Sequence, residues 1–258
     1  MVSHILWHPV VRSTVCLVTV VLTWTIVVHI LDPSPISFPS PARVWDTARS
    51  MLKGGFEGTS LLGHIWASTR RVGIGFALSV IVGVPLGVAM GTKEMARRVS
   101  TTYIALFRPV PPFAWLAILV VWFGIGEVPK VLIIFVGSVT IIALNTMDGV
   151  RRVPRQFQEA AQSLGASRRQ VFRFILVPAA VPQILNGARV ALLVAWTAVL
   201  AAELVAATAG IGVIILDSSN YLRTDQAFVG IFIIALCGGI SDWVIGRIQK
   251  SVEPWGNR

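Results

Sequence analysis

Charged side chains are scarce in this chain, and one carboxylate interrupts an otherwise apolar stretch. Glu203 lies within residues 190–207, which carry no other ionisable group. A carboxylate in apolar surroundings is costly unless a cation or hydrogen-bond donors accompany it, and Arg70 and Arg71 are the candidate partners. Two roles stay open for Glu203: a buried structural ion pair, or a residue that lines or gates a polar path between helices.

The remaining reactive side chains form no catalytic or metal-binding pattern. Cys16 and Cys237 lie inside apolar stretches and have no spacing typical of a disulfide framework or a metal site. The histidines, which are His4, His8, His29 and His64, show no ligand spacing either. The chain also lacks the glycine-rich loop ending in Lys-Ser or Lys-Thr that cradles nucleotide phosphates. We therefore expect no catalytic residue, no metal ligand and no ATP hydrolysis by this chain.

The composition indicates a protein whose solvent is lipid. Of 258 residues, 55% are apolar and only 13% are charged, whereas soluble domains carry about 25% charged residues. The net charge of +10 would by itself be compatible with nucleic-acid binding. However, the basic residues fall between long apolar stretches, which is typical of membrane proteins. We expect the chain to lie in the lipid bilayer and to bind no nucleic acid.

Six apolar stretches are long enough to cross a bilayer, which takes about 20 helical residues. They are residues 13–31, residues 72–91, the stretch between Arg108 and Glu127, and residues 131–147, 190–207 and 227–245. The sequence therefore predicts an all-α membrane protein, one transmembrane domain over residues 1–258 with about six helices. Both termini then share one side, which holds thirteen Lys and Arg residues against five on the other. The positive-inside rule identifies that side as the cytoplasm.

Three prolines open the third of these stretches, directly after Arg108; they are Pro109, Pro111 and Pro112. Two interpretations stay open. If the chain is helical from Arg98, the prolines break a helix inside the membrane, where freed backbone groups are tolerated beside a cavity. Arg108 then places a positive charge beside that cavity. Alternatively, Arg108 lies at the inner headgroups and the prolines shape the start of the span.

Most of the positive charge on the cytoplasmic side falls in one loop, residues 148–182. Pro154 can occupy the first position of a helix, and the good helix formers of residues 155–164 predict a short helix after it. Gly165 suits the left-handed backbone that ends many helices. The loop therefore starts with a short helix and a tight glycine turn.

A second short helix is predicted after the turn. Ser167 and Gln170 have the spacing of a capping box, in which each side chain satisfies a backbone group of the other residue. We expect this helix to end near Pro178 and Pro182. The two helices would then project into the cytoplasm as a hairpin, the alternative being a hairpin that lies on the lipid headgroups.

The spacing of residues in this loop resembles that of a known family. Its fixed positions are Glu159, Ala160, Ala161, Gly165, Ile175, Val177 and Pro178. This pattern resembles the signature loop of ABC importer permeases, in which leucine stands where this chain has Val177. The match is specific because it fixes four features over 20 residues and falls in the cytoplasmic loop before the penultimate span.

Flanking segments extend the resemblance over about residues 62–248. They are Arg108-Pro109-Val110-Pro111-Pro112, residues 122–127 and Ala202-Glu203-Leu204. These segments are similar to the branch of the family that imports sulfonates, taurine, nitrate and related small anions. Within that branch, the taurine permeases are the most similar.

The resemblance implies the type I ABC importer permease fold, with loop 148–182 acting as a coupling helix that docks on a separate ATPase subunit. The residues implied in docking are Glu159, Ala160, Ala161, Ser163, Leu164, Gly165, Ala166 and Arg168. The two alanines would let the helix sit close, Gly165 would set the turn, and Glu159 would meet polar groups of the ATPase. A docked helix can pass a rigid-body motion to the spans attached to it.

The resemblance also implies partners and a solute. The partners are two ATPase subunits that hold ATP and Mg, a periplasmic or lipoprotein substrate-binding protein, and a second permease copy, expected to be identical. The place is the bacterial inner membrane. The solute would be taurine or another alkyl sulfonate, with nitrate, bicarbonate or a pyrimidine precursor as alternatives. A different class, an ATPase-independent channel or secondary transporter, would be expected to show an internal repeat or several paired charges within spans.

Overall fold

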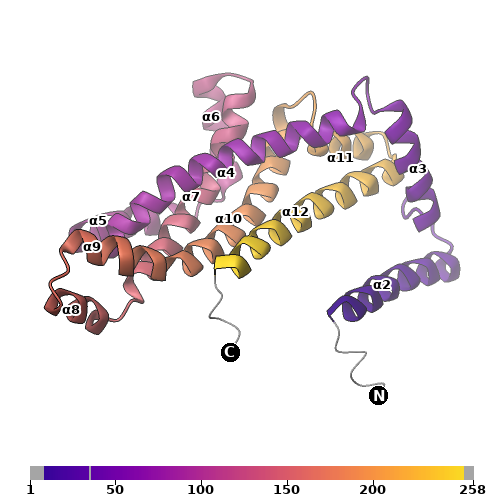
Figure 1. Ribbon diagram of the computed structural model, residues 1–258. Coiled ribbons are helices and arrows are strands. Elements are labelled where there is room, and N and C mark those ends of the chain that lie inside the picture. Colours follow the sequence, from indigo (N-terminus) through magenta and orange to yellow (C-terminus); the bar gives the residue numbers. More distant parts are fainter. Residues whose placement is uncertain (1–8, 35, 253–258) are drawn as a thin grey trace, which may run out of the picture.

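The computed structural model describes residues 9–34 and 36–252, and its regular elements over these ranges are helices (Figure 1). The long helices are α2 (Pro9–Leu31), α4 (Leu61–Thr92), α7 (Glu127–Arg151), α10 (Val177–Ala206) and α12 (Thr224–Val252). The shorter ones are α3 (Pro41–Gly54), α5 (Glu94–Phe107), η1 (Pro112–Trp115), α6 (Leu116–Phe123), α8 (Arg155–Ser163), α9 (Arg168–Val171), η2 (Phe172–Leu176) and α11 (Ile211–Asn220).

Close packing of α4 against α7 forms the centre of the bundle. Small residues recur at every fourth position along one face of α4, and this face meets α7 directly. A Cβ atom built on Gly75 would lie 2.7 Å from the Cβ of Ile134, and one built on Gly91 would lie 2.7 Å from the Cβ of Val150. Glycine therefore lets the two backbones approach closely, as small residues do between membrane helices. The buried side chains of α10, among them Val199, complete this core.

Among the described residues, five helices are long and apolar enough to cross a membrane, and a sixth crossing is obtained if one bent pair counts as a single span. That pair joins residues Glu94–Phe107 to Pro112–Phe123 at an angle of 84°. The expected number of about six spans is thus confirmed. The expected bounds of the third span are wrong, because α6 has only eight residues. The chain is already helical from Glu94, and the prolines that follow divide that helix instead of opening a new one.

The helix after the glycine turn is also longer than the sequence predicted. Residues 168–205 run without a break through α9, the π-helical segment η2 and α10. Pro178 and Pro182 do not end it, so that prediction is wrong. Pro178 follows the π-helical segment η2 almost directly, and local π-helical adjustments of this kind let a membrane helix accommodate a proline. The fifth span therefore begins well before residue 190, and Arg189 lies in the middle of α10, not at its end.

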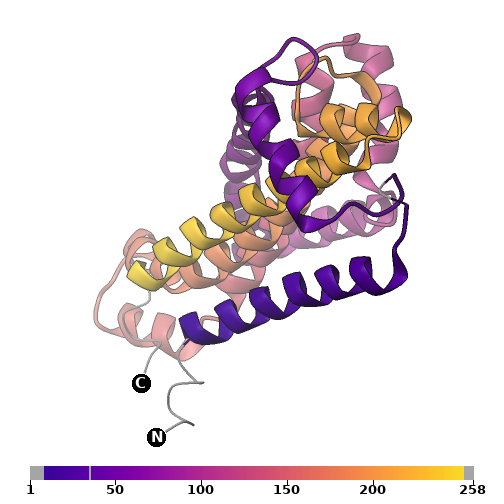
Figure 2. The ribbon, with the colours of Figure 1, turned by 90° about the vertical axis from the view of Figure 1, so that its right-hand side faces the viewer.

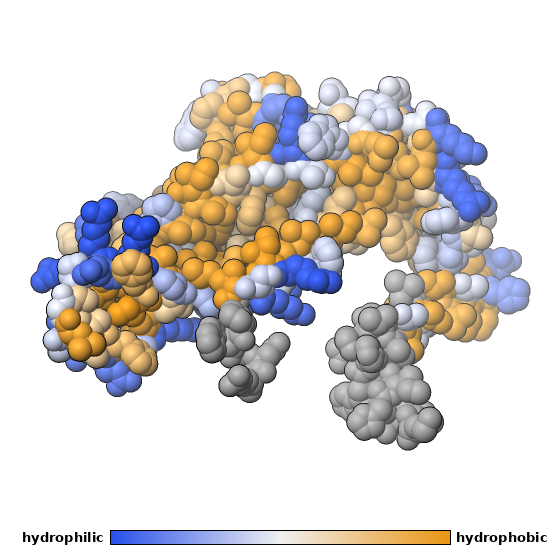
Figure 3. Space-filling view, in the orientation of Figure 1, coloured by the Kyte–Doolittle hydropathy of each residue, from blue (hydrophilic) through white to orange (hydrophobic). Residues whose placement is uncertain are grey.

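Polar side chains mark the two ends of the bundle. Figure 3 shows apolar surface over the middle of the long helices, hydrophilic side chains near α5 and α9 and over α3, and a mixed surface over α8. In Figures 1 and 2, α8, the start of α2 and the last turn of α12 lie toward one end, and α6 and α11 toward the other. We name the first the basic end and the second the far end. α2 stands beside the bundle and touches it through Trp24, which stacks on Phe228 and Phe232 of α12.

Candidate functional site

The hairpin predicted from the sequence is present at the basic end. α8 stands apart from the long helices at the lower left of Figure 1, and α9 begins the continuous helix that leads into α10. Pro154 is the N-cap of α8 rather than its first residue, and Gly165 makes the turn with a φ of 86°. The capping box of Ser167 and Gln170 is confirmed, with both of its hydrogen bonds formed. Local sequence signals therefore fix the shape of this loop.

Most residues implied in ATPase docking are open to contact from outside the chain. Ala161 and Ala166 are half-buried, and the other six are exposed: Glu159, Ala160, Ser163, Leu164, Gly165 and Arg168. Leu164, next to the turn, has 89% of its surface exposed. The tip of the hairpin thus presents small, apolar and charged side chains together.

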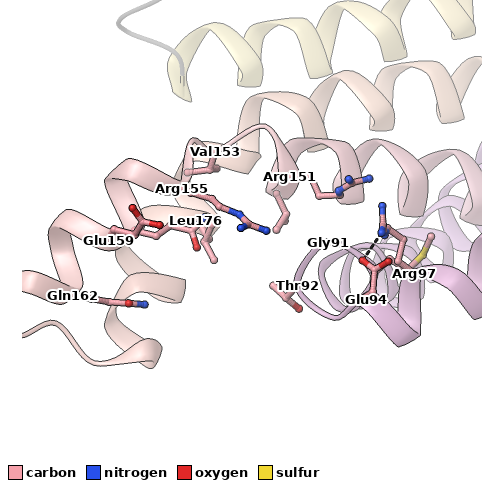
Figure 4. A pocket seen from close by; sticks show the side chains of 13 residues that line it. Gly91, Thr92, Glu94, Arg97, Arg151, Val153, Arg155, Glu159, Gln162 and Leu176 are labelled. Carbon is pink, nitrogen blue, oxygen red and sulfur yellow. Dashed lines mark hydrogen bonds and ion pairs between the residues drawn. The ribbon is translucent and has the colours of Figure 1, made fainter.

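A cavity of about 590 Å³ lies between the hairpin and the corner where α4 meets α5 (Figure 4). Glu159 lines this cavity together with Arg155 of α8, Arg151 of α7 and Arg97 of α5. Arg97 forms an ion pair with Glu94. The signature carboxylate therefore borders a cavity of its own chain as well as the exposed face of the hairpin.

At the far end, Glu203 is buried and fully hydrogen-bonded. Its carboxylate lies 2.6 Å from Nη1 of Arg71 and accepts hydrogen bonds from Oγ of Ser68 at 2.7 Å and from the backbone N–H of Gly212 at 2.9 Å. Arg71 and Glu203 have 4% and 1% of their side-chain surfaces exposed. Of the two candidate arginines, the structure brings Arg71 to Glu203, while Arg70 contacts Glu127 instead.

Arg71 connects three parts of the fold. Its Nε and Nη2 each donate a hydrogen bond to the carboxylate of Glu127, at the start of α7; the two bonds are 2.8 Å and 2.7 Å long. A further bond of 2.7 Å runs from Nη1 to the carbonyl oxygen of Ala209, between α10 and α11. Lys130, also buried, lies 3.3 Å from Glu127. A planar guanidinium can satisfy several acceptors at fixed angles, so Arg71 holds α4, α7 and the α10–α11 connection together.

His64 holds the same connection from the other side. Its Nδ1 lies 3.1 Å from the backbone nitrogen and 3.0 Å from the carbonyl oxygen of Gly210, and its Nε2 lies 3.2 Å from the carbonyl oxygen of Phe56. Ser68 accepts the N–H of Ile211 at 2.8 Å. We call His64, Ser68, Arg71, Glu127 and Glu203 the far-end polar cluster. It satisfies the buried charges and the backbone groups of residues 209–212.

Comparison with known proteins identifies the family to which this chain belongs. The family described as "Binding-protein-dependent transport system inner membrane component" matches residues 83–254. The chain belongs to this family. Its members are ABC importer permeases, which work with ATPase and binding-protein partners, so the protein is a multi-pass membrane subunit of such an importer.

Curated relatives of the permease are named for three related solutes. The taurine transport system permease protein TauC of Escherichia coli (strain K12) is 36% identical over 96% of this chain and 90% of its own length. The putative aliphatic sulfonates permease SsuC of Bacillus subtilis (strain 168) is 28% identical over 92% and 85%. The nitrate import permease NrtB of Synechocystis sp. is 29% identical over 98% and 92%. The resemblance to the taurine, sulfonate and nitrate branch is thus confirmed.

Solved structures show the same fold. The permease superposes on a chain of the inward-facing MetNI methionine ABC transporter with a TM-score of 0.67 and 19% identity, covering 74% of this chain and 95% of that one. An amino acid ABC transporter gives a TM-score of 0.57 and 19% identity, over 75% and 92%. The type I importer permease fold expected from the sequence is confirmed.

Arg108 lies where the bent pair of helices breaks. It caps the C-terminal end of α5 and is exposed. Pro109, Pro111 and Pro112 occupy the break, and η1 begins at Pro112. The chain is helical from before Arg98 and the prolines interrupt that helix, which is the premise of the first interpretation. The part of the permease that the structure describes offers the Arg108 side chain no hydrogen bond or ion pair.

The structure also gives polar contacts to four residues for which the sequence predicted none. Asp242 lies within the predicted sixth span and binds Arg189 of α10 through two hydrogen bonds, of 2.8 and 2.6 Å. Glu127 was noted only as part of a motif. A charge inside an apolar stretch was the available signal for Asp242. Ser68 and His64 carried no such signal, because both precede the predicted second span, residues 72–91, whereas α4 already begins at Leu61.

A substitution at Gly210 tests how closely the backbone of the far-end polar cluster packs against the carboxylate of Glu203. Its φ is 149°, and a Cβ built on it would lie 2.5 Å from both carboxylate oxygens of Glu203. We expect Gly210→Ala to destabilise the permease by about 2 kcal/mol, from strain and displacement of Glu203. Gly124→Ala is the control, because Gly124 also has a positive φ, 76°, but a Cβ there meets nothing within 4 Å. Equal shifts of the melting temperature in detergent would contradict the tight fit.

Proposed function

We propose that this permease forms the path by which taurine or another alkyl sulfonate enters the cell. Support comes from the relatives, because the taurine system permease TauC matches nearly the whole chain at 36% identity. Nitrate, bicarbonate and a pyrimidine precursor are the alternative solutes. The binding protein that delivers the solute would hold the main selectivity.

Energy for transport would come through the exposed hairpin. The observation that carries this proposal is the signature pattern Glu159 to Pro178 on a helical hairpin that leaves most of its docking residues uncovered. Two ATPase subunits, which hold ATP and Mg, would each receive one such hairpin in a dimer of identical permeases. Family-like structure over residues 62–248, with coupling loop 148–182, would form the moving core.

Orientation follows from charge. The basic end carries α8, α9 and the end of α12, and the positive-inside rule puts this end, with both termini, in the cytoplasm. The permease would thus lie in the bacterial inner membrane and receive solute from a periplasmic or lipoprotein binding protein at the far end. Arg108, Pro109, Pro111 and Pro112 would border the path at the break between α5 and η1, where an unpaired guanidinium can meet an anion. Glu203 would serve as a structural partner of Arg71 and not as a contact for the solute.

The substrate is tested by reconstituting the permease with its cognate ATPase and binding protein in proteoliposomes. We expect ATP-dependent uptake of radiolabelled taurine, with labelled nitrate, bicarbonate and a pyrimidine precursor giving much less. Uptake of another of these solutes in preference to taurine would replace the substrate assignment. Uptake without the ATPase would instead favour an ATPase-independent channel or secondary transporter.

Coupling is tested by changing the turn of the hairpin. Gly165 has a φ of 86° and donates its N–H to the carbonyl oxygen of Gln162 at 2.9 Å; proline can adopt neither feature. We expect Gly165→Pro to reduce ATP-dependent uptake by about fivefold or more, the range of typical coupling between sites, with normal insertion. Glu159→Lys should weaken co-purification of the ATPase. Glu57→Lys is the matched control, since Glu57 is exposed on a loop before α4; unaltered ATPase binding and uptake in both hairpin variants would refute docking.

A further inference from the structure

The cavity at the basic end contains positive charge that the protein itself does not neutralise. Figure 4 shows the side chains of Arg97, Arg151 and Arg155, which reach it from α5, α7 and α8. Arg97 is occupied by Glu94, which also pairs with Arg98. Within residues 9–34 and 36–252, Arg151 and Arg155 form no hydrogen bond or ion pair with a side chain. Two guanidinium groups without a side-chain partner therefore border one partly open cavity.

The charged residues that line the cavity indicate which charge a bound ligand would carry. Once Glu94 and Arg97 are set aside as a pair, the lining holds Arg151 and Arg155 against the single carboxylate of Glu159. The space thus has one positive charge in excess. Guanidinium groups bind tetrahedral oxyanions through paired hydrogen bonds. A group with one negative charge and several oxygens in tetrahedral arrangement fits both the charge and the donors.

The position and the volume of the cavity restrict the class of ligand further. The cavity lies where α4 and α7 end and α5 begins, and the ends of membrane-spanning helices lie at the level of the lipid headgroups. Basic pockets between membrane helices at this depth bind anionic headgroups. The volume of about 590 Å³ is within the range of small-molecule pockets, about 300–1,000 Å³. Apolar side chains of Met90, Val150 and Leu176 complete the lining, as suits the glycerol part of a lipid.

We propose that Arg151 and Arg155 form a binding site for a tetrahedral monoanion, namely the phosphodiester headgroup of an anionic membrane lipid. A free oxyanion of the same shape and charge, such as an alkyl sulfonate, is the other source of this chemistry. The bound ligand would hold the hairpin against the α4–α5 corner. Its binding is measured on the permease alone, without transport and without the ATPase.

The experiment measures binding to the purified full-length permease in nonionic detergent by microscale thermophoresis. The probes are phosphatidylglycerol, phosphatidylethanolamine with the same acyl chains, and sodium methanesulfonate. We expect phosphatidylglycerol to bind more tightly than phosphatidylethanolamine, and the double variant Arg151→Gln/Arg155→Gln to bind it about 30-fold more weakly, from two lost arginine contacts. Arg169→Gln/Arg173→Gln removes the same charge from exposed positions outside the cavity and should change affinity less than twofold, by the small effect of remote surface charge.

A third variant distinguishes loss of the binding site from misfolding of the permease. Glu159→Gln removes the only unpaired carboxylate of the lining, so it should tighten phosphatidylglycerol binding roughly threefold, a gain that unfolding cannot produce. Methanesulfonate binding that weakens in the arginine double variant, without preference for phosphatidylglycerol, would support the site and assign it to a free anion. Equal binding of every probe by the double variant and the unmodified permease, or no gain in Glu159→Gln, would overturn the proposal.

Discussion

Replacing Arg71 with methionine is expected to destabilise the permease by about 3–5 kcal/mol, because it leaves a buried carboxylate without its cation. Glu203 has 1% of its side-chain surface exposed and would keep only the hydrogen bonds from Ser68 and Gly212. Methionine fills a similar volume, so the loss is mainly electrostatic. The apparent melting temperature in detergent should fall by roughly 10 °C.

The matched control for this change is the neighbouring residue. Arg70 forms its ion pair with the same Glu127 acceptor, at 3.2 Å, but with 49% of its side chain exposed. Exposed ion pairs contribute about 0–1 kcal/mol, so Arg70→Met should hardly shift the melting temperature. Similar shifts for the two variants would show that burial of the Arg71 pair carries no special weight.

A double variant separates lost charge pairing from lost packing. In Arg71→Met/Glu203→Gln the uncompensated charge is gone, so part of the stability should return relative to Arg71→Met alone. ATPase co-purification should stay normal in Glu203→Gln, since the far-end polar cluster is remote from the hairpin. Further destabilisation by the second substitution would contradict a charge-based role.

The sequence was most informative where structure is decided locally. Pro154, Gly165, Ser167 and Gln170 each act on one or two adjacent residues, so their types predicted the hairpin without knowledge of the rest of the fold. The boundaries at Pro178 and Pro182 were wrong because a proline only disfavours a helix. Continuation into the long apolar helix α10, with the π-helical segment before it, outweighs that penalty.

Long-range contacts set the limit of what the sequence could give. The cost of burying Glu203 required a cation, and that reduced the candidates to two adjacent arginines. Choosing between them depends on the rotation of α4 against α10, which decides whether residue 70 or 71 faces inward. The roles of Ser68 and His64 depend in addition on the path of residues 207–210, which no local signal describes.

The approach of α4 to α7 leads to the second large effect. A Cβ built on Gly87 would lie 2.5 Å from the Cβ of Thr146 and would also overlap the backbone oxygen of Ala143. A backbone oxygen cannot rotate away, so Gly87→Val must separate the two helices. We expect a loss of about 3 kcal/mol, at the upper end of overpacking effects, and a fall of the apparent melting temperature of roughly 8 °C.

Gly73→Val on the same helix isolates the contact. Gly73 is exposed, and a Cβ built on it meets nothing within 4 Å, so this variant changes helix propensity and side-chain entropy but not the α4–α7 distance. It should melt close to the unmodified permease. Because α7 ends in Arg151 and leads directly to α8, separation at Gly87 should also displace the hairpin and lower ATP-dependent uptake, whereas Gly73→Val should not. If Gly87→Val melts and transports like Gly73→Val, the glycine face does not set the distance between α4 and α7.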